Sequence, residues 1–157
     1  MPEPFEPRTD PDVDLRVPAD RRELTARPAT ILATIAAGGA LGALARAGLQ
    51  HAVPHAPTGF GWATFTINTS GCLLIGVLMA VLGHLDGGHP LARPFLGVGV
   101  LGGFTTFSTY TVDVQQAIVA GAPGTALAYL AATVLGALAA VGVGDAVTAG
   151  LLRRANR

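Results

Sequence analysis

The chain has 157 residues, of which half are apolar and only 13% are charged, and its mean hydropathy is +0.50. These values are typical of a membrane protein. The formal net charge is zero and the sequence contains no lysine, so it lacks the basic surface that nucleic-acid binding requires. The single cysteine, Cys72, excludes an intrachain disulfide.

Residues 1–27 carry most of the charge of the chain, seven acids and five arginines, together with several prolines. Such a segment cannot bury enough apolar surface to offset the entropy lost on ordering. We therefore expect residues 1–27 to form a disordered cytoplasmic tail. An alternative makes residues 31–45 the apolar core of a signal peptide, but the long polar leader and the three further apolar segments disfavour it.

Four apolar segments follow the tail, at approximately 29–50, 61–83, 94–120 and 124–150. Each exceeds the roughly 20 residues that a helix needs to span a hydrocarbon core. Short separators rich in proline and glycine divide them, which predicts helix ends at these places. The sequence therefore predicts an all-α membrane protein with four transmembrane helices over residues 28–152 and a basic cytoplasmic C-terminus over residues 153–157.

The arginines predict the orientation of these helices. With four spans, both termini and the second loop share one side of the membrane. Arg46 is the one arginine near the other side; those near the membrane boundaries on the shared side are Arg16, Arg21, Arg22, Arg27, Arg93, Arg153, Arg154 and Arg157. The positive-inside rule therefore places both termini in the cytoplasm.

Three patterns that elsewhere carry chemistry occur here in unsuitable surroundings. Residues 97–102 match the glycine fingerprint of dinucleotide-binding proteins, but they lie inside an apolar span with no preceding strand. Residues 68–70 form a glycosylation sequon, also inside a span. The histidines, which we interpret as solvated loop residues rather than metal ligands, are His51, His55, His84 and His89. No catalytic set is present, so we expect no enzyme.

Asn68 is the first polar signal inside a span. A carboxamide in hydrocarbon must find hydrogen-bond partners, and either an anion or a neighbouring helix could supply them. Thr64 lies one helical turn earlier and extends the same polar face. Tyr129 and Thr133 form a second hydroxyl pair, on the fourth span. Arg46 is a candidate for an electropositive vestibule, with a position at the membrane interface as the alternative.

Residues 102–110, with the sequence GGFTTFSTY, combine two glycines, four threonine or serine residues and three aromatic rings inside the third span. Glycine leaves helical geometry easily, so we expect the third helix to break near its middle. The carbonyl groups freed by such a break suit a cation such as Na+. The ring edges of Phe107 and Tyr110, three residues apart, suit a small anion. Asp113 receives no assigned role.

Three motifs, at residues 38–46, 64–71 and 102–110, occur in an order and at a spacing that resemble the Fluc/CrcB family of fluoride channels. The resemblance covers roughly residues 29–150. It implies a dimer of four-helix subunits in antiparallel orientation, with two fluoride pores along the subunit interface. It also implies a structural Na+ at the dimer centre, held by backbone carbonyls at the break in the third helix.

Residue by residue, the resemblance gives Gly102 and Thr105 the Na+ carbonyls. It assigns to the fluoride pathway Asn68, Phe107, Tyr110, Thr64, Ser108, Thr109, Tyr129 and Thr133. Tyr110 departs from the family pattern, which usually has a second phenylalanine there, and Ala63 replaces the usual glycine. The partner implied is a second copy or a paralogous subunit in antiparallel orientation, within membrane lipid.

The function that the resemblance implies is a passive fluoride channel of the bacterial inner membrane, which lowers cytoplasmic fluoride and gives fluoride resistance. One alternative is a small four-helix multidrug or cation exporter, which needs an intramembrane carboxylate that the first span lacks. The other is a structural membrane subunit, which would leave Asn68 and the cluster at residues 105–110 without a purpose.

Overall fold

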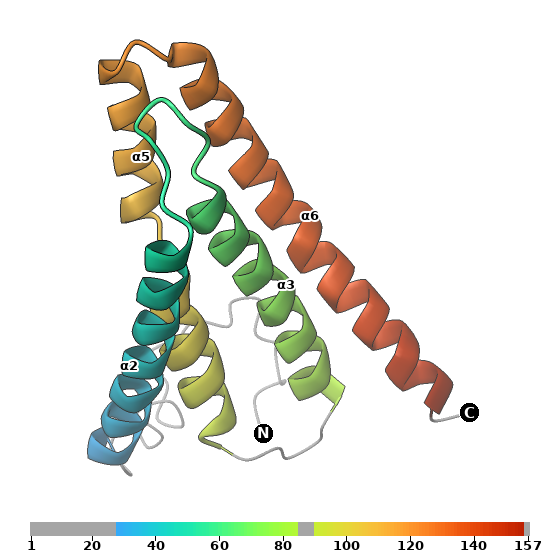
Figure 1. Ribbon diagram of the computed structural model, residues 1–157. Coiled ribbons are helices and arrows are strands. Elements are labelled where there is room, and N and C mark those ends of the chain that lie inside the picture. The colour runs from blue at the N-terminus through green and yellow to red at the C-terminus, as the bar shows by residue number, and fades with distance from the viewer. Residues whose placement is uncertain (1–27, 85–89, 156–157) are drawn as a thin grey trace, which may run out of the picture.

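The structure, a computed structural model, describes residues 28–84 and 90–155. The expected disordered tail at residues 1–27 lies outside the described residues. All regular elements within the described ranges are helical (Figure 1): α2 (Pro28–Ala52), α3 (Trp62–His84), the π-helix η1 (Arg93–Leu101), α4 (Gly102–Phe104), α5 (Ser108–Val119) and α6 (Pro123–Ala155). Helices α2 and α3, the run Arg93–Val119, and α6 are long and apolar enough to cross a membrane. The all-α class with four membrane-capable helices is therefore confirmed.

The ends of the helices follow local chemistry. Helices α2 and α6 both begin at a proline, whose missing amide hydrogen costs nothing in the first helical turn. At the turn from α5 to α6, Gly121 adopts a positive φ of 78°, which an L side chain would disfavour. The amide of Gly121 donates to Ile118 O at 3.0 Å and that of Ala122 to Ala117 O at 2.8 Å, which completes a Schellman cap.

Glycines bring α2 into close contact with the first half of the third span. Helix α2 packs mainly on η1 and α4. A β-carbon built on Gly38 would lie 2.5 Å from Phe95 O and 3.0 Å from the Cα of Gly99. One built on Gly42 would lie 2.8 Å from the amide nitrogen of Phe104. The two backbones are therefore in direct contact, as at small-residue interfaces between membrane helices.

A second glycine contact joins α3 to α6. A β-carbon on Gly76 would meet the backbone of α6, at 2.9 Å from the amide nitrogen of Asp145. One on Gly144 would in turn meet the backbone of α3 at Leu73 and Val77. Helix α3 packs more extensively on α6 than on any other element. The pairs α2 with η1 and α3 with α6 therefore make the most extensive helix contacts in the described structure.

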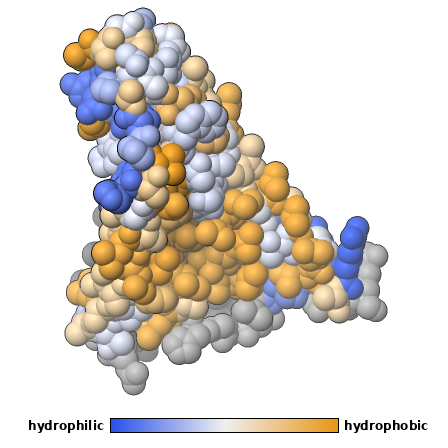
Figure 2. Space-filling view, viewed as in Figure 1, coloured by the Kyte–Doolittle hydropathy of each residue, from blue (hydrophilic) through white to orange (hydrophobic). Residues whose placement is uncertain are grey.

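The surface of the single chain is strongly apolar. Large side chains point outward along every span, for example Leu44, Val119 and Leu135, with exposed fractions of 70%, 81% and 66%. Hydrophobic residues cover much of the lower half of the visible face in Figure 2, whereas the end with the α5 to α6 turn is more polar. Such a surface suits lipid or another subunit rather than water.

Candidate functional site

The backbone leaves helical geometry in the middle of the third span. Helix α4 ends at Phe104, Thr105 is extended with φ of −73° and ψ of 158°, and α5 begins at Ser108. Before this point, the Gly102 amide closes the π-helix by hydrogen bonds to Gly97 O and Gly99 O. Such a segment leaves amides and carbonyls without their helical partners, and within a membrane other protein groups must supply them.

Asn68 of α3 supplies two of these partners. Its Nδ2 donates to Thr106 O at 2.9 Å, and its Oδ1 accepts from the Thr106 amide at 2.8 Å. The carboxamide thus pairs with both polar backbone groups of one residue, as a neighbouring strand would. This contact joins α3 to the interrupted segment and explains why an uncharged polar side chain occupies the middle of the second span.

The hydroxyl of Thr106 in turn caps α5. The amide of Thr109 donates to Thr106 Oγ1 at 3.2 Å, the pattern of a helix N-cap. The same hydroxyl contacts Thr109 Oγ1 at 3.1 Å and Ser108 Oγ at 3.4 Å. Two of the hydroxyl residues predicted for the pathway, Ser108 and Thr109, therefore meet around the buried Thr106, which the prediction did not include.

The carbonyls of Gly102 and Thr105 lack their usual helical donors. In an α-helix the amide of Thr106 would donate to Gly102 O, and that of Thr109 to Thr105 O. Here Thr106 donates to Asn68 and Thr109 donates to the Thr106 hydroxyl. The carbonyl oxygens of Gly102 and Thr105 are uncharged acceptors, and Gly102 is exposed. Such oxygens fit a hard cation such as Na+. The residues present are thus compatible with the cation that the resemblance implies.

The two aromatic residues of the segment lie in different environments. Phe107 is 76% exposed, whereas Tyr110 is only 5% exposed. Their ring centroids are 5.8 Å apart, and Tyr110 lies 5.3 Å from the ring of Tyr129 on α6. The Tyr110 hydroxyl donates to Leu130 O at 2.9 Å. A row of three rings therefore leads from the surface of the chain to α6, and the hydrogen bond of the Tyr110 hydroxyl to Leu130 O fixes the middle ring.

We expect the substitution Tyr110→Phe to lower the free energy of unfolding by about 0.5–1.5 kcal/mol, because it removes one hydrogen bond and keeps the ring contacts. Denaturant-induced unfolding in detergent measures this difference. Thr111→Val is the control, because the exposed Thr111 hydroxyl bonds only to the backbone of its own turn, at Phe107 O and Ser108 O. Equal stabilities of the two variants would contradict the role given to the Tyr110 hydroxyl.

Tyr129 is 2% exposed and lies at the end of this row. Its hydroxyl donates to Asp113 Oδ2 at 3.1 Å and also interacts with the side chain of Thr64, which is 1% exposed. The second oxygen of Asp113 is 3.9 Å from His55 Nε2, in the segment between α2 and α3. Two pathway residues predicted on different spans are thus brought together, around an acid for which the sequence suggested no role.

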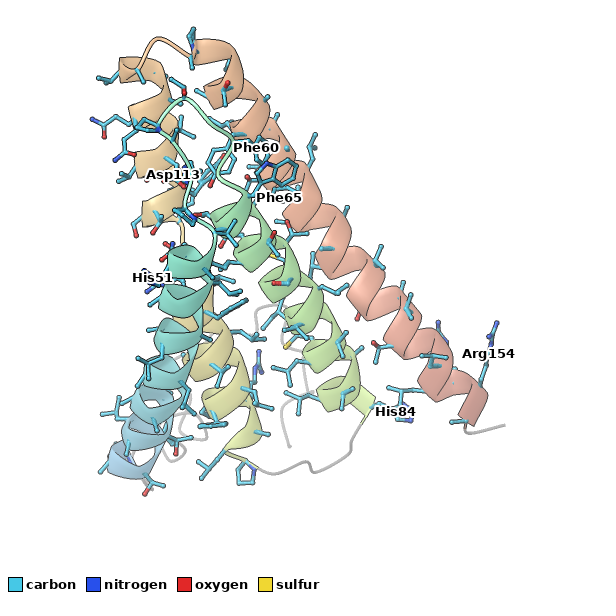
Figure 3. The ribbon with its side chains drawn as sticks, in the orientation of Figure 1. His51, Phe60, Phe65, His84, Asp113 and Arg154 are labelled. Carbon is cyan, nitrogen blue, oxygen red and sulfur yellow. The ribbon has the colours of Figure 1, made fainter. Side chains whose placement is uncertain are left out.

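An aromatic cluster covers this group. Phe60 lies 4.5 Å from Trp62, 5.6 Å from Phe65 and 5.0 Å from Tyr129, measured between ring centroids. Figure 3 shows Phe60, Phe65 and Asp113 near the segment that joins α2 to α3, far from His84 and Arg154 at the other end of the molecule. The segment therefore closes over Tyr129 and Asp113 at one end of the bundle.

Two predicted residues lie apart from these contacts. Thr133 is 4% exposed, and its hydroxyl has no hydrogen-bond partner among the described residues. Its position one turn after Tyr129 continues the polar face of α6. Arg46 is partly exposed and lies near the C-terminal end of α2, the end that leads into the segment before α3.

Comparison with known proteins identifies the family. Residues 33–145 match the family described as CrcB-like protein, Camphor Resistance (CrcB). The chain belongs to the CrcB family. A relative from Thermobifida fusca (strain YX), named Fluoride-specific ion channel FluC 2, is 56% identical over 125 residues, which cover 80% of this chain and 93% of the relative.

Two relatives from Streptomyces carry similar names. The Fluoride-specific ion channel FluC 2 of Streptomyces avermitilis is 49% identical over 124 residues, or 79% of this chain and 78% of the relative. The Fluoride-specific ion channel FluC 1 of Streptomyces coelicolor is 47% identical over 135 residues, or 86% and 88%. Each name describes an ion channel, a non-enzymatic function, in agreement with the expectation that the chain is not an enzyme.

Proposed function

We propose that this chain is a fluoride-selective, passive ion channel that lowers the fluoride concentration in the cytoplasm. The observation that carries the proposal is the interrupted third span, held by Asn68 and flanked by Phe107, in a chain 56% identical to a protein named as a fluoride-specific channel. The groups along this segment are uncharged donors and ring edges. Such groups can replace part of the hydration of a small anion without binding it too tightly to release.

The proposed path follows the row of rings and hydroxyls. Phe107 would present its ring edge to the anion, and Ser108 and Thr109 would supply hydroxyl donors beside it. The path continues past Tyr110 and Tyr129 toward Thr64 and Thr133. Asn68 holds Thr106 through Oδ1 and one Nδ2 hydrogen, and its second Nδ2 hydrogen would donate to the anion. Arg46 would attract anions at the vestibule.

The proposed assembly is an antiparallel dimer with pores along the interface, formed with a second copy or a paralogous subunit. Exposed groups of the interrupted segment support it. Phe107 is 76% exposed, and Gly102 is also exposed; apart from its neighbours along the chain, a β-carbon built on Gly102 would meet only Gly97 O, at 3.8 Å. A second subunit packed on this face would cover the ring and line the path from both sides.

In such a dimer the carbonyls of Gly102 and Thr105 from both subunits would hold a structural Na+. When bound, the cation would balance the partial negative charge of the converging carbonyls. Two hydrogen bonds would keep these carbonyls available to the cation. Asn68 accepts from the Thr106 amide in place of Gly102 O, and the Thr106 hydroxyl accepts from the Thr109 amide in place of Thr105 O.

The proposed location is the bacterial inner membrane, with both termini in the cytoplasm. Hydrogen fluoride crosses the membrane as a neutral molecule and dissociates in a less acidic cytoplasm, where the anion is trapped. A passive channel lets the anion leave down its gradient, so no nucleotide site is required.

Fluoride efflux from proteoliposomes tests the proposal. Purified protein in vesicles loaded with potassium fluoride should release fluoride when valinomycin allows potassium to follow, and should release no chloride in a parallel experiment. Exchange of a cationic drug for protons without fluoride efflux would support the exporter instead. No transport of either kind would support the structural subunit.

A further inference from the structure

Asp113 is a buried acid beside a proposed anion path. Its side chain is 9% exposed, and it lies six residues before the end of α5, within the third span. A carboxylate here would repel fluoride that approaches Tyr129. A channel for anions should therefore neutralise this charge whenever it conducts.

The surroundings of Asp113 show what can neutralise it. From α6, the Tyr129 hydroxyl donates to Oδ2, with the Tyr110 hydroxyl one ring further away on α5. From the segment before α3, His55 Nε2 lies 3.9 Å from Oδ1, and its side chain is 24% exposed. Within residues 28–84 and 90–155, His55 is the one basic side chain within 4.0 Å of this carboxylate.

The segment that joins α2 to α3 packs closely on Asp113 and Tyr129. A β-carbon on Gly61 would lie 2.9 Å from the Tyr129 hydroxyl and 3.1 Å from Asp113 Oδ2, so the backbone of the connecting segment presses directly on both groups. Phe60 anchors the same segment on the ring of Tyr129. These contacts fix the end of the connecting segment on Asp113 and Tyr129, and His55, earlier in the same segment, lies 3.9 Å from the carboxylate with its side chain 24% exposed.

We propose that His55 and Asp113 form a proton-dependent charge pair that controls anion entry beside Tyr129. The inference rests on the proposed fluoride channel. When His55 is protonated, the pair is neutral and fluoride enters. When His55 is neutral, the carboxylate stands uncompensated and entry slows.

The direction of the pH effect follows from both groups. Histidine side chains ordinarily change charge between about pH 5 and 8. Protonation of His55 places a positive charge beside the Asp113 carboxylate. The entrance therefore becomes less negative as the pH falls, and conduction rises with acidity. This is the condition in which hydrogen fluoride enters cells fastest.

The test measures fluoride efflux from proteoliposomes with the same pH on both sides, at about pH 5.5 and about pH 8, a range that brackets histidine titration. Protein-free vesicles at each pH account for the leak of hydrogen fluoride. For the unmodified chain we expect efflux to be roughly tenfold faster at the lower pH, in line with the effect of local charge on ion entry.

Two variants should remove the pH dependence in opposite ways. His55→Gln should give the slow rate at both pH values, because the carboxylate stays uncompensated. Asp113→Asn should give the fast rate at both, because no negative charge remains. His51→Gln is the matched control, since His51 lies in the last turn of α2 without an ion pair to Asp113, and it should keep the pH dependence of the unmodified chain.

Failure of this inference is distinct from failure of the proposed function. Efflux that is equally fast at both pH values, with His55→Gln unchanged, would overturn the charge pair and leave the channel proposal intact. Absence of fluoride efflux at any pH would instead contradict the proposed function. His55 lies in a connecting segment, so His55→Gln is expected to fold, and it decides the matter even if Asp113→Asn is unstable.

Discussion

Replacement of Asn68 by alanine is expected to abolish fluoride efflux. The variant loses both hydrogen bonds to Thr106 and leaves its amide and carbonyl unpaired within the membrane. Each unsatisfied backbone group costs about 1–3 kcal/mol. The Thr106 amide is then free to return to Gly102 O, which would remove the geometry on which the proposed cation site and the ring of Phe107 depend. Efflux from proteoliposomes and denaturant-induced unfolding measure the two effects.

Ser70→Ala provides the control for Asn68→Ala. Ser70 lies on the same helix, but its hydroxyl bonds only to its own backbone, at Thr66 O and Ile67 O. We expect this variant to retain efflux and to lose little stability. If Asn68→Ala conducts fluoride as fast as Ser70→Ala, then the contact with Thr106 is not required for the open path.

Replacement of Gly42 by alanine should strongly destabilise the folded chain. Gly42→Ala and Gly38→Ala, each made singly, should be the two most destabilising glycine-to-alanine changes in α2. The new β-carbon would collide with Val100 O and lie 2.8 Å from the Phe104 amide nitrogen, and neither backbone atom can rotate away. Overpacking of this kind costs about 1–3 kcal/mol. Thermal unfolding in detergent measures the loss.

The same substitution at Gly48 serves as the matched control and should have the opposite sign. A β-carbon on Gly48 meets no heavy atom within 4 Å, and the residue lies in the same helix. Alanine there should stabilise the helix by about 0.5–1 kcal/mol, because glycine loses more backbone entropy on folding. Equal effects at the two positions would show that α2 does not pack on η1 and α4 as described.

The spans could be predicted from the sequence because the membrane leaves few choices. A backbone in hydrocarbon must satisfy its own hydrogen bonds, so apolar length alone indicates a helix. The observed ends lie within two residues of the predicted ones for the first three spans. The fourth helix instead continues to Ala155, five residues beyond the expected end. Arg153 and Arg154 favour this extension, because positive charges stabilise the last turn of a helix.

The partners within the site could not be predicted in the same way. Asn68 could be recognised as a polar residue in need of a partner, but Thr106 lies 38 residues away, and helical periodicity does not show which helices meet. The sequence shows that Tyr110 departs from the pattern of the family it resembles. It does not show the acceptor of the Tyr110 hydroxyl, Leu130 O, because that contact depends on the packing of α5 against α6. The sequence alone predicts a solvated loop residue at His55, because only the folded chain places it near Asp113.

The pairing of the helices also bears on how the chain is assembled during synthesis. Helix α2 finds its main partner in η1, with α3 between them in sequence, and α3 finds its partner in α6, after the whole third span. Among consecutive spans, α5 packs on α6 across a short turn, whereas α2 has little contact with α3, and α3 has little contact with the third span. The glycine-lined face of α2 therefore lacks its packing partner until the third span is made, and that of α3 lacks its partner until the fourth span is made. Insertion of the last span is thus the event that allows the bundle to close.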